Sequence, residues 1–377
     1  MKISTSTIWL ASLLLWMSCQ KKPVTPAGPD WPQIKSKVAP QVLLPGEYGT
    51  PYPLEVNTLG WEDGSYITRD GLTLYCFYAP MDLFSFIFSG AAADPCEVKP
   101  YLRGPFQEIL QTVPPSLAGT CDYFLSSDIL ISHRNSTDEA FPAWSITAFS
   151  LPATFEGAPQ LILNAQNPDV VDYMVFTFLN PEPSAGNGTS DIALFRSTTR
   201  NPAGGYEMLP APVNSTTTTE DNPHLERING GELLLYFVSH DRDGVVGGND
   251  IFWSRSSDDG QSWSDPLPVN FNTTGDEDMP HIWQDGNGQY WLYYMDSDNE
   301  ISRRQQQTAG DWQNWGPATK VIGKGNALAI GEPTLTQWGD VVFALVYDAG
   351  TGWGSDATNR YDNDMWVLPR KGSPFDR

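Results

Sequence analysis

The chain has 377 residues and a formal net charge of −23, with 45 acidic residues against 22 lysines and arginines. This charge excludes nucleic acid and anionic membrane surfaces as partners, because both are themselves negative. Frequent glycine (33) and proline (31) residues separate short apolar runs that are rich in aromatic residues. Such a composition favours one large all-β domain, and we expect it to act as a monomer.

The N-terminus carries an export signal. Lys2 precedes an apolar run, residues 8–17, which is too short to span a bilayer and is followed by Ser18 and Cys19. A small residue directly before a cysteine resembles the lipobox of bacterial lipoproteins, although Trp16 stands where a leucine is usual. The resemblance implies a signal peptide over residues 1–19 and lipidation of Cys19. The protein would then be anchored to the outer membrane of a bacterial cell, on the periplasmic or the outer surface.

Residues 20–40 are rich in proline, lysine, glycine and alanine, and we expect them to form a flexible tether. The remaining cysteines are Cys76, Cys96 and Cys121, and export makes a disulfide permissible. Cys96 and Cys121 flank a long non-repeating segment, and a disulfide between them could hold its ends together. Cys76 lies in an apolar run, and we expect it to be a small buried side chain. The sequence leaves all three pairings open.

An acidic motif recurs along the chain in a fixed register. Residues 57–63 (NTLGWED) return as residues 272–278 (NTTGDED), and both copies lead to an isoleucine and an Asp-Gly turn at the same offsets. A partial copy begins at Glu220. Repetition of this kind indicates one supersecondary unit that is stacked several times.

Each repeat predicts four short antiparallel strands, and radial repetition of such sheets gives a β-propeller. Five units open near residues 61, 156, 220, 277 and 331, and the fifth lacks an outer strand. Residues 53–56 have the pattern of that missing strand, so we expect the N-terminal strand to close the ring. We therefore predict a single all-β propeller over residues 41–377 with five four-stranded blades. A sixth blade hidden in residues 80–150 is the alternative.

Residues 82–125 form an aromatic-rich insertion in the first predicted blade. Long insertions on a rigid scaffold are common binding elements, and aromatic rings suit the stacking of a sugar. The same aromatic side chains could instead pack the insertion against the side of the propeller.

Three stretches resemble known families. Residues 241–251 (DRDGVVGGNDI), with Trp263 and residues 272–280 (NTTGDEDMP), resemble the TolB-type, WD-repeat-like propeller repeats of exported bacterial proteins. Residues 256–263 (SSDDGQSW) resemble the Asp-box of sialidases, which implies a structural turn away from any catalytic centre. The acids that open the repeats are similar to those of the five-bladed glycosidases, namely arabinanases, xylosidases and invertases.

The acidic openings would ring one mouth of the propeller channel. The likeness to glycosidases implies one carboxylate as base or nucleophile and another as proton donor. The candidate catalytic residues are Asp63, Asp221, Asp278 and Glu332, and the candidate ligand-binding residues are Glu62, Glu220, His224, Arg227, Glu277 and His281. An acid repeated in every blade also suits a structural cap on a turn, and we favour that reading because catalysis requires asymmetry.

Calcium is the cofactor that the sequence suggests. Asp241 and Asp243, with Asp250 a few residues later, are similar to the opening of a calcium loop, although the full EF-hand pattern is absent. The acidic ring could also bind calcium. His224 and His281 hold the same repeat position beside these acids, so a site with two histidines and two carboxylates is a further hypothesis.

Taken together, these features predict an exported, membrane-anchored propeller lipoprotein that binds a glycan or an envelope protein. The alternative is a glycoside hydrolase that uses carboxylates at the channel mouth. A hydrolase requires two acids about 5–10 Å apart with one of them protonated near neutral pH. Equivalent, solvated acids around the ring would favour the binding module.

Overall fold

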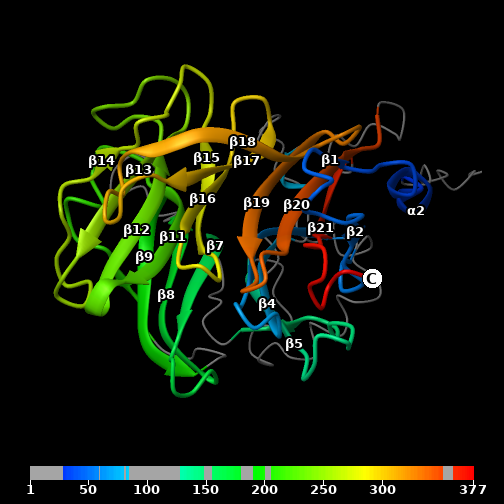
Figure 1. Ribbon diagram of the computed structural model, residues 1–377, viewed down its shortest axis with the longest axis horizontal. Helices are drawn as coiled ribbons and strands as arrows, with labels where there is room; N and C mark the ends of the chain where they lie inside the picture. Colours follow the sequence, from blue (N-terminus) through cyan, green and yellow to red (C-terminus); the bar gives the residue numbers. More distant parts are fainter. Residues whose placement is uncertain are drawn as a thin grey trace, which may run out of the picture.

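A computed structural model describes residues 29–58, 60–79, 82–84, 128–147, 155–179, 190–199, 205–350 and 360–377. Five antiparallel sheets surround a common centre, with β7, β11, β15 and β19 among the strands nearest to it (Figure 1). The expected sites at Cys19, Cys96 and Cys121, and nearly all of the aromatic insertion, lie outside the described residues.

The strands of each blade pair in chain order from the inside of the ring outwards, so the prediction of five antiparallel blades is confirmed. Residues 128–146, which the six-blade alternative would have used, supply the two outer strands of blade 1. The strands are β3 (Trp61–Ile67), β4 (Thr73–Ala79), β5 (Asp128–His133) and β6 (Ser145–Ile146) in blade 1; β7 (Phe155–Leu163), β8 (Val170–Leu179), β9 (Ser190–Thr199) and β10 (Glu207–Met208) in blade 2; β11 (Asp221–Ile228), β12 (Glu232–Ser239), β13 (Asp250–Ser256) and β14 (Leu267–Pro268) in blade 3; β15 (Asp278–Gln284), β16 (Tyr290–Met295), β17 (Glu300–Gln306) and β18 (Trp315–Gly323) in blade 4; and β19 (Ala329–Leu335), β20 (Val341–Asp348) and β21 (Tyr361–Leu368) in blade 5.

The N-terminal segment closes the ring as expected. Strand β2 (Tyr52–Pro53) pairs with β21, with Tyr52 opposite Val367, and becomes the outer strand of blade 5. Strand β1 (Gln41–Val42) pairs with β18 and adds a fifth strand to blade 4, which the sequence did not predict. The N-terminal segment therefore spans two neighbouring blades.

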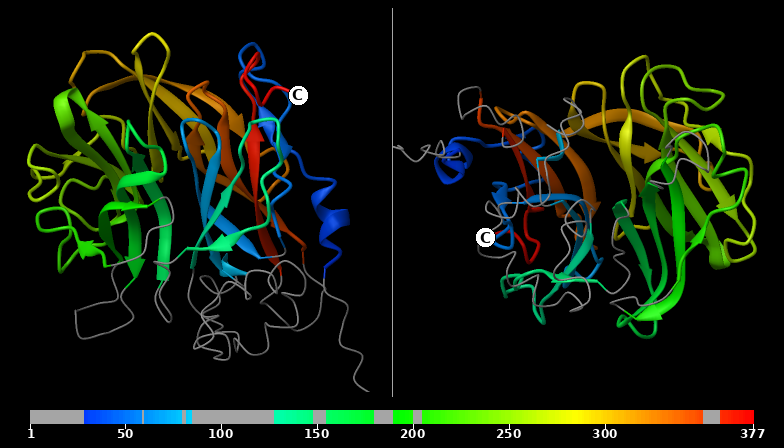
Figure 2. Two further views of the ribbon diagram at one scale, coloured as in Figure 1. Left: turned by 90° about the horizontal axis from the view of Figure 1, so that it is seen from below. Right: turned by 180° about the vertical axis from the view of Figure 1, so that it is seen from behind.

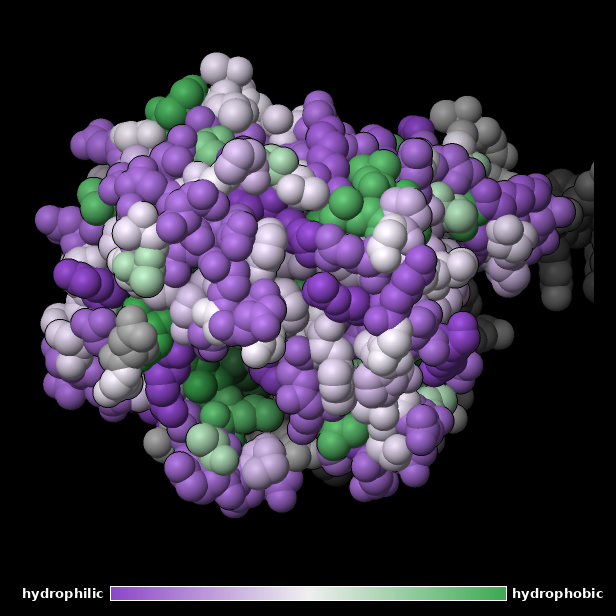
Figure 3. Space-filling model, viewed as in Figure 1, coloured by the Kyte–Doolittle hydropathy of each residue, from purple (hydrophilic) through white to green (hydrophobic). Residues whose placement is uncertain are grey.

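Apolar side chains fill the space between neighbouring blades, and each of the five interfaces has its own buried cluster. Cys76 is fully buried and unpaired in the cluster between blades 5 and 1, as its apolar surroundings predicted. The face seen in Figure 3 is mostly hydrophilic, with apolar side chains in a hollow near its lower centre and in a second patch at its upper right. No helix among the described residues is long and apolar enough to cross a membrane.

Every inner strand carries a β-bulge near its start. One residue in each bulge adopts a positive φ angle: Gly64, Ala158, Asn222, Met279 and Glu332. Only glycine adopts this conformation without steric cost, so the four other side chains are held there by the surrounding fold. These bulges define the geometry of the channel mouth.

The stretch from Ser256 to Trp263 folds into a turn after β13, and Arg196 of blade 2 donates to its Gly260 carbonyl at 3.1 Å. Asp258 accepts hydrogen bonds from the Ser256 hydroxyl at 2.8 Å and the Ser262 backbone N–H at 2.9 Å. Hydrogen bonds from Ser262 and Ser256 lower the pKa of Asp258 to about 2. Trp263 Nε1 donates to the Gly260 carbonyl at 3.1 Å. The side chains of Asp258 and Trp263 therefore stabilise the turn, as expected for a structural role.

Residues 30–40 lie within the range for which we expected a flexible tether, but the structure shows them packed against the propeller. Helix α2 (Trp31–Lys35) lies outside the ring beside β21 (Figure 2). Trp31 is buried, and Lys35 Nζ lies 2.7 Å from Asp362 Oδ2 and 2.6 Å from Asp364 Oδ1. Burial raises the pKa of Asp362 to about 7, and without the ammonium both carboxylates would be buried and unpaired.

Replacement of Lys35 by methionine is expected to destabilise the propeller. An ion pair broken on one side leaves an uncompensated buried charge, which costs about 3 kcal/mol. Denaturant unfolding at pH 7 should show this loss for Lys35→Met, and the loss should shrink at pH 5 as the two carboxyls take up protons. The control is Lys37→Met, since Lys37 is exposed on the same segment. Equal stability of the two variants would contradict the ion-pair role of Lys35.

Candidate functional site

Four of the predicted catalytic residues meet where the inner strands begin. Asp63, Asp221, Asp278 and Glu332 each come from a different blade, and we call them the acid cluster. Burial, followed by repulsion from Asp63, Asp278 and Asp221, raises the pKa of Glu332 well above its usual value. The structure therefore brings together the set that the repeats predicted.

The four acids are not equivalent, which corrects our expectation of a uniform ring. Asp63, Asp221 and Asp278 directly precede the positive-φ residue of their bulge, whereas Glu332 is itself that residue, with φ +57°. The position of the three aspartates is taken by Gly157 in blade 2 and by Gly331 in blade 5. Two of the five blades therefore lack an aspartate there, and one replaces it with a glutamate that starts from a different backbone position.

The three aspartates differ in their hydrogen bonds. Asp278 accepts from the side-chain amides of Asn222 at 2.8 Å and Asn249 at 2.7 Å, and from the Met279 backbone N–H at 2.7 Å. These donors favour the ionised form, although burial raises the pKa of Asp278 overall.

Asp221 and Asp63 are more exposed than Asp278. Asp221 accepts from the Thr177 hydroxyl at 2.7 Å and from the Asn222 backbone N–H at 2.8 Å. Asp63 accepts from Trp61 Nε1 at 2.9 Å, and burial raises its pKa to about 6. Asp63 is therefore mostly ionised at neutral pH, while burial and repulsion from three acids raise the pKa of Glu332 well above its usual value.

The acid cluster does not have the spacing of a preformed metal cage. No three of its members bring ligand oxygens within 4.8 Å of one another. Among the residues that the structure describes, only Asp296, Asp298 and Glu300 form such a group. Lys320 Nζ lies 2.6 Å from both Asp298 and Glu300, so the lysine ammonium already compensates the negative charge of that group.

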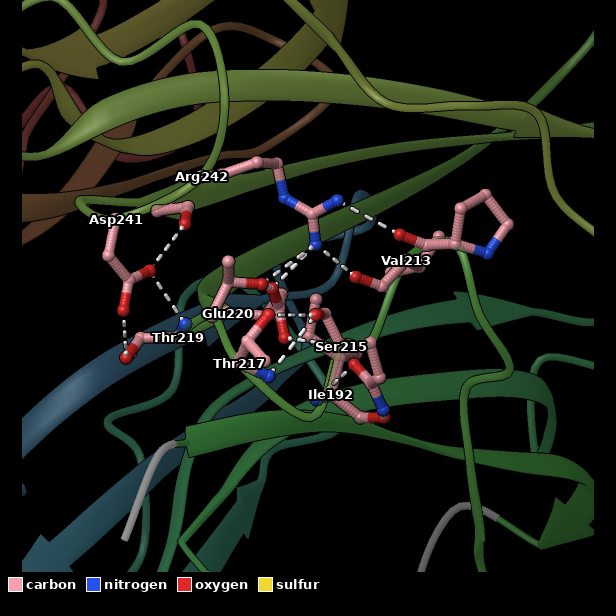
Figure 4. Close-up of polar contacts among 12 residues, drawn as sticks. Ile192, Val213, Ser215, Thr217, Thr219, Glu220, Asp241 and Arg242 are labelled. Carbon is pink, nitrogen blue, oxygen red and sulfur yellow. Dashed lines mark hydrogen bonds and ion pairs between the residues drawn. The ribbon is translucent and has the colours of Figure 1, made fainter. Parts of the chain in front are cut away.

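The glutamates that precede the aspartates have a structural role. Glu62, Glu220 and Glu277 are buried, and each accepts hydrogen bonds from backbone N–H and hydroxyl groups of the loop that enters its blade. In Figure 4, Glu220 also receives the guanidinium of Arg242, which reaches across to the Val213 carbonyl. The loop donors are Thr58 for Glu62, Ser215 and Thr218 for Glu220, and Thr273 for Glu277.

Arg227 and two aspartates of the expected calcium loop have partners outside the acid cluster. Arg227 Nη2 pairs with Asp172 Oδ2 at 2.9 Å, between blades 3 and 2. Asp241 accepts from the Thr219 backbone N–H at 2.8 Å (Figure 4), while Asp243 is exposed. Asp250 is buried and accepts from the Val246 backbone N–H. These three aspartates do not converge on a common point within the described chain.

His224 and His281 lie one layer deeper in the channel than the acids. Their ring centroids are 4.3 Å apart, and both side chains are buried. Burial lowers both pKa values well below the usual value, so both imidazoles are neutral at physiological pH. The same register position supplies Tyr66, Gln160 and Thr334 in the other blades, which the sequence analysis missed.

No family model and no curated protein matches the sequence. Several solved structures are similar to the fold. They include a thermostable family-43 glycoside hydrolase (12% identity, 85% of this chain and 96% of that chain, TM-score 0.46) and the α-L-arabinofuranosidase PaAbf62A from Podospora anserina (9% identity, 86% and 96%, TM-score 0.47). A xylan β-1,4-xylosidase from Bacillus halodurans C-125 is similar at 14% identity, with 84% and 54% coverage and a TM-score of 0.47.

The acid cluster predicts that stability falls as pH rises from about 5 to 8. The pKa values of Asp63, Asp221, Asp278 and Glu332 are all raised, so the folded state binds more protons than the unfolded chain in this window. The melting temperature should be several degrees higher at pH 5 than at pH 8.

The variants Asp63→Asn and Glu332→Gln should reduce this difference in melting temperature. Asp258→Asn should not, because the pKa of Asp258 is about 2 and lies outside the window. A melting temperature that rises from pH 5 to pH 8 would contradict the prediction that ionisation of the acid cluster destabilises the folded state.

Proposed function

We propose that the protein is a glycoside hydrolase whose reaction takes place at the acid cluster. The observation that carries the proposal is asymmetry: one acid, Glu332, starts from a different backbone position and has its pKa raised by burial and by its three neighbours. A glycosidase needs such a protonated acid next to an ionised one. The sequence alone favoured a binding module because it suggested equivalent acids.

In this proposal, Glu332 is the general acid that protonates the glycosidic oxygen. Asp63 is the base or nucleophile, because it is partly exposed and ionised at neutral pH with a pKa of about 6. After burial, repulsion from Asp221 and Asp278 helps to raise the pKa of Glu332, which favours a proton on the donor. Carboxylates at these two positions would also stabilise positive charge that develops on the sugar ring.

A structural cap is a weaker explanation for the three aspartates than for the glutamates. Glu62, Glu220 and Glu277 already tie each incoming loop to its blade. Burying several additional like charges in one place lowers stability, so a fold without a function for them would gain by replacing them.

The test is hydrolysis of aryl glycosides and plant and bacterial polysaccharides by protein lacking residues 1–19. Glu332→Gln and Asp63→Asn should each reduce kcat/KM about 10²–10⁴-fold, the usual value of a general acid or base. Asp298→Asn is the control, because this exposed residue lies in the turn between β16 and β17. The pH profile of kcat/KM should rise near pH 6 as Asp63 ionises and fall when Glu332 loses its proton.

Binding of a glycan without any product would overturn the hydrolase and leave a lectin-like module. Failure of every glycan to bind would instead leave an envelope protein as the partner. Full activity in both acid variants would also reject the assignment of roles, whatever the substrate.

We propose further that the protein is exported and anchored to the outer membrane through a lipid on Cys19. The support is the apolar run of residues 8–17 and the Ser18-Cys19 pair. In a bacterial host, the wild type should fractionate with membranes and incorporate labelled palmitate, and Cys19→Ser should do neither. The control Cys76→Ala should keep the label, since Cys76 is buried in the fold. Labelled Cys19→Ser protein would rule out this anchor.

A further inference from the structure

A cavity of about 330 Å³ opens at the end of the channel opposite the acid cluster. All five blades line it, with residues from the far half of the inner strands and from the turns that follow them. Arg69, Ala165 and Gln337 lie just beyond the ends of β3, β7 and β19, whereas the acids lie where these inner strands begin. His224 and His281 form its inner end.

The two histidines leave one hydrogen-bond acceptor and one donor unused. His224 Nδ1 lies 3.1 Å from Gln160 Oε1, an amide oxygen that only accepts, so Nδ1 carries the proton and Nε2 has a free lone pair. His281 Nε2 lies 3.3 Å from the backbone N–H of Leu335, which only donates, so the proton of this neutral ring is on Nδ1.

Neither His224 Nε2 nor His281 Nδ1 has a hydrogen-bond partner among the described residues, although both side chains are 1% exposed. A buried polar atom without a partner costs about 1–3 kcal/mol, so this pair favours a ligand that satisfies both atoms. A hydroxyl group fits both, because it can donate to His224 and accept from His281 at the same time.

The charges around the cavity disfavour an anion, because Asp70 and Glu226 line it together with Arg69. Arg69 Nη2 lies 2.7 Å from Glu226 Oε2 and also donates to the Ile282 carbonyl at 2.9 Å, so its charge is compensated. Both imidazoles are neutral. His224 Nε2 lies 4.0 Å from Glu226 Oε2, but these two residues and His281 do not bring three ligand atoms within 4.8 Å of one another, which disfavours a metal ion.

The volume and the remaining walls fit a small polyol. A single water occupies about 30 Å³ in the liquid, so the cavity holds far more than one bridging water. Tyr66, Leu161 and Leu163 supply an apolar wall for the C–H face of a sugar, while Arg69, Glu226 and Asn164 supply polar groups for its hydroxyls.

We propose that this cavity binds one small neutral polyhydroxylated molecule, a monosaccharide or sugar alcohol, with one hydroxyl seated between His224 and His281. The site is separate from the acid cluster and does not depend on the hydrolase proposal. A free sugar and the terminal sugar of a longer chain offer the same chemistry, so the experiment includes both.

The test is calorimetric titration of the protein lacking residues 1–19 with xylose, glucose and sorbitol, with a longer xylan oligosaccharide, and with sodium acetate as a charged comparison. We expect at least one neutral probe to bind with a Kd of about 1 mM or tighter, and acetate not to bind. Tighter binding of the oligosaccharide than of the free sugar would identify a chain end as the source.

Ala165→Trp should block the cavity and weaken binding at least about tenfold, which corresponds to about 1.4 kcal/mol. Its matched control is Gln166→Trp, the exposed neighbour that does not line the cavity. Glu226→Gln should weaken sugar binding and let acetate bind, because Arg69 then loses its counter-charge. Asp298→Asn, on an exposed turn outside the cavity, should leave binding unchanged.

Three results would overturn the proposal. The first is that no neutral probe binds the wild type, which would leave water as the occupant. The second is equal binding by the wild type and Ala165→Trp, with melting curves that show both are folded. The third is loss of binding in Asp63→Asn alone, which would place the sugar in the acid cluster.

Discussion

The ring of five β-bulges is the constraint on which the channel depends. At the bulges, the inner strands of neighbouring blades contact one another directly. The Ser65 hydroxyl donates to the Glu332 carbonyl at 3.1 Å, and the Glu332 backbone N–H contacts Met279 Sδ at 3.2 Å. A Cβ atom on Gly331 would lie 2.5 Å from the same sulfur. The close approach of the inner strands thus fixes where the acids lie and how far they are buried.

Such a site is stable only because the blades bind one another through other contacts. Burial of four carboxyl groups in one place works against folding, and the apolar clusters between blades offset it. Residues at the level of the two channel histidines also link neighbouring blades. Tyr66 donates to the Leu161 carbonyl at 2.6 Å, and the Thr334 hydroxyl accepts from the Ile67 N–H at 3.2 Å. The scaffold can therefore hold strained and charged residues at its centre.

The repeats predicted the blades, their number and their closure because strand patterns and turn residues are local signals. The repeats did not predict that Glu332 lies one position later in its bulge than the aspartates do in theirs, because the repeats were compared by their acids. A proline follows the positive-φ residue at Pro159, Pro223, Pro280 and Pro333, and alignment on this proline would have placed Glu332 opposite Met279. The roles of Asn249 and Lys35 depend on contacts between distant segments, which the sequence pattern does not contain.

The N-terminal segment has a consequence for the order of folding. Strand β1 completes blade 4, β2 completes blade 5, and Lys35 pairs with Asp362 and Asp364 near the other end of the chain. The contacts of β2 and Lys35 cannot form until β21, the final strand, has been synthesised, and that of β1 cannot form before β18. Until then the partner strands keep open edges, and such edges are prone to aggregate. The ring is thus completed by strands that precede every other strand in the sequence, and β2 must wait for the last strand before it can pair.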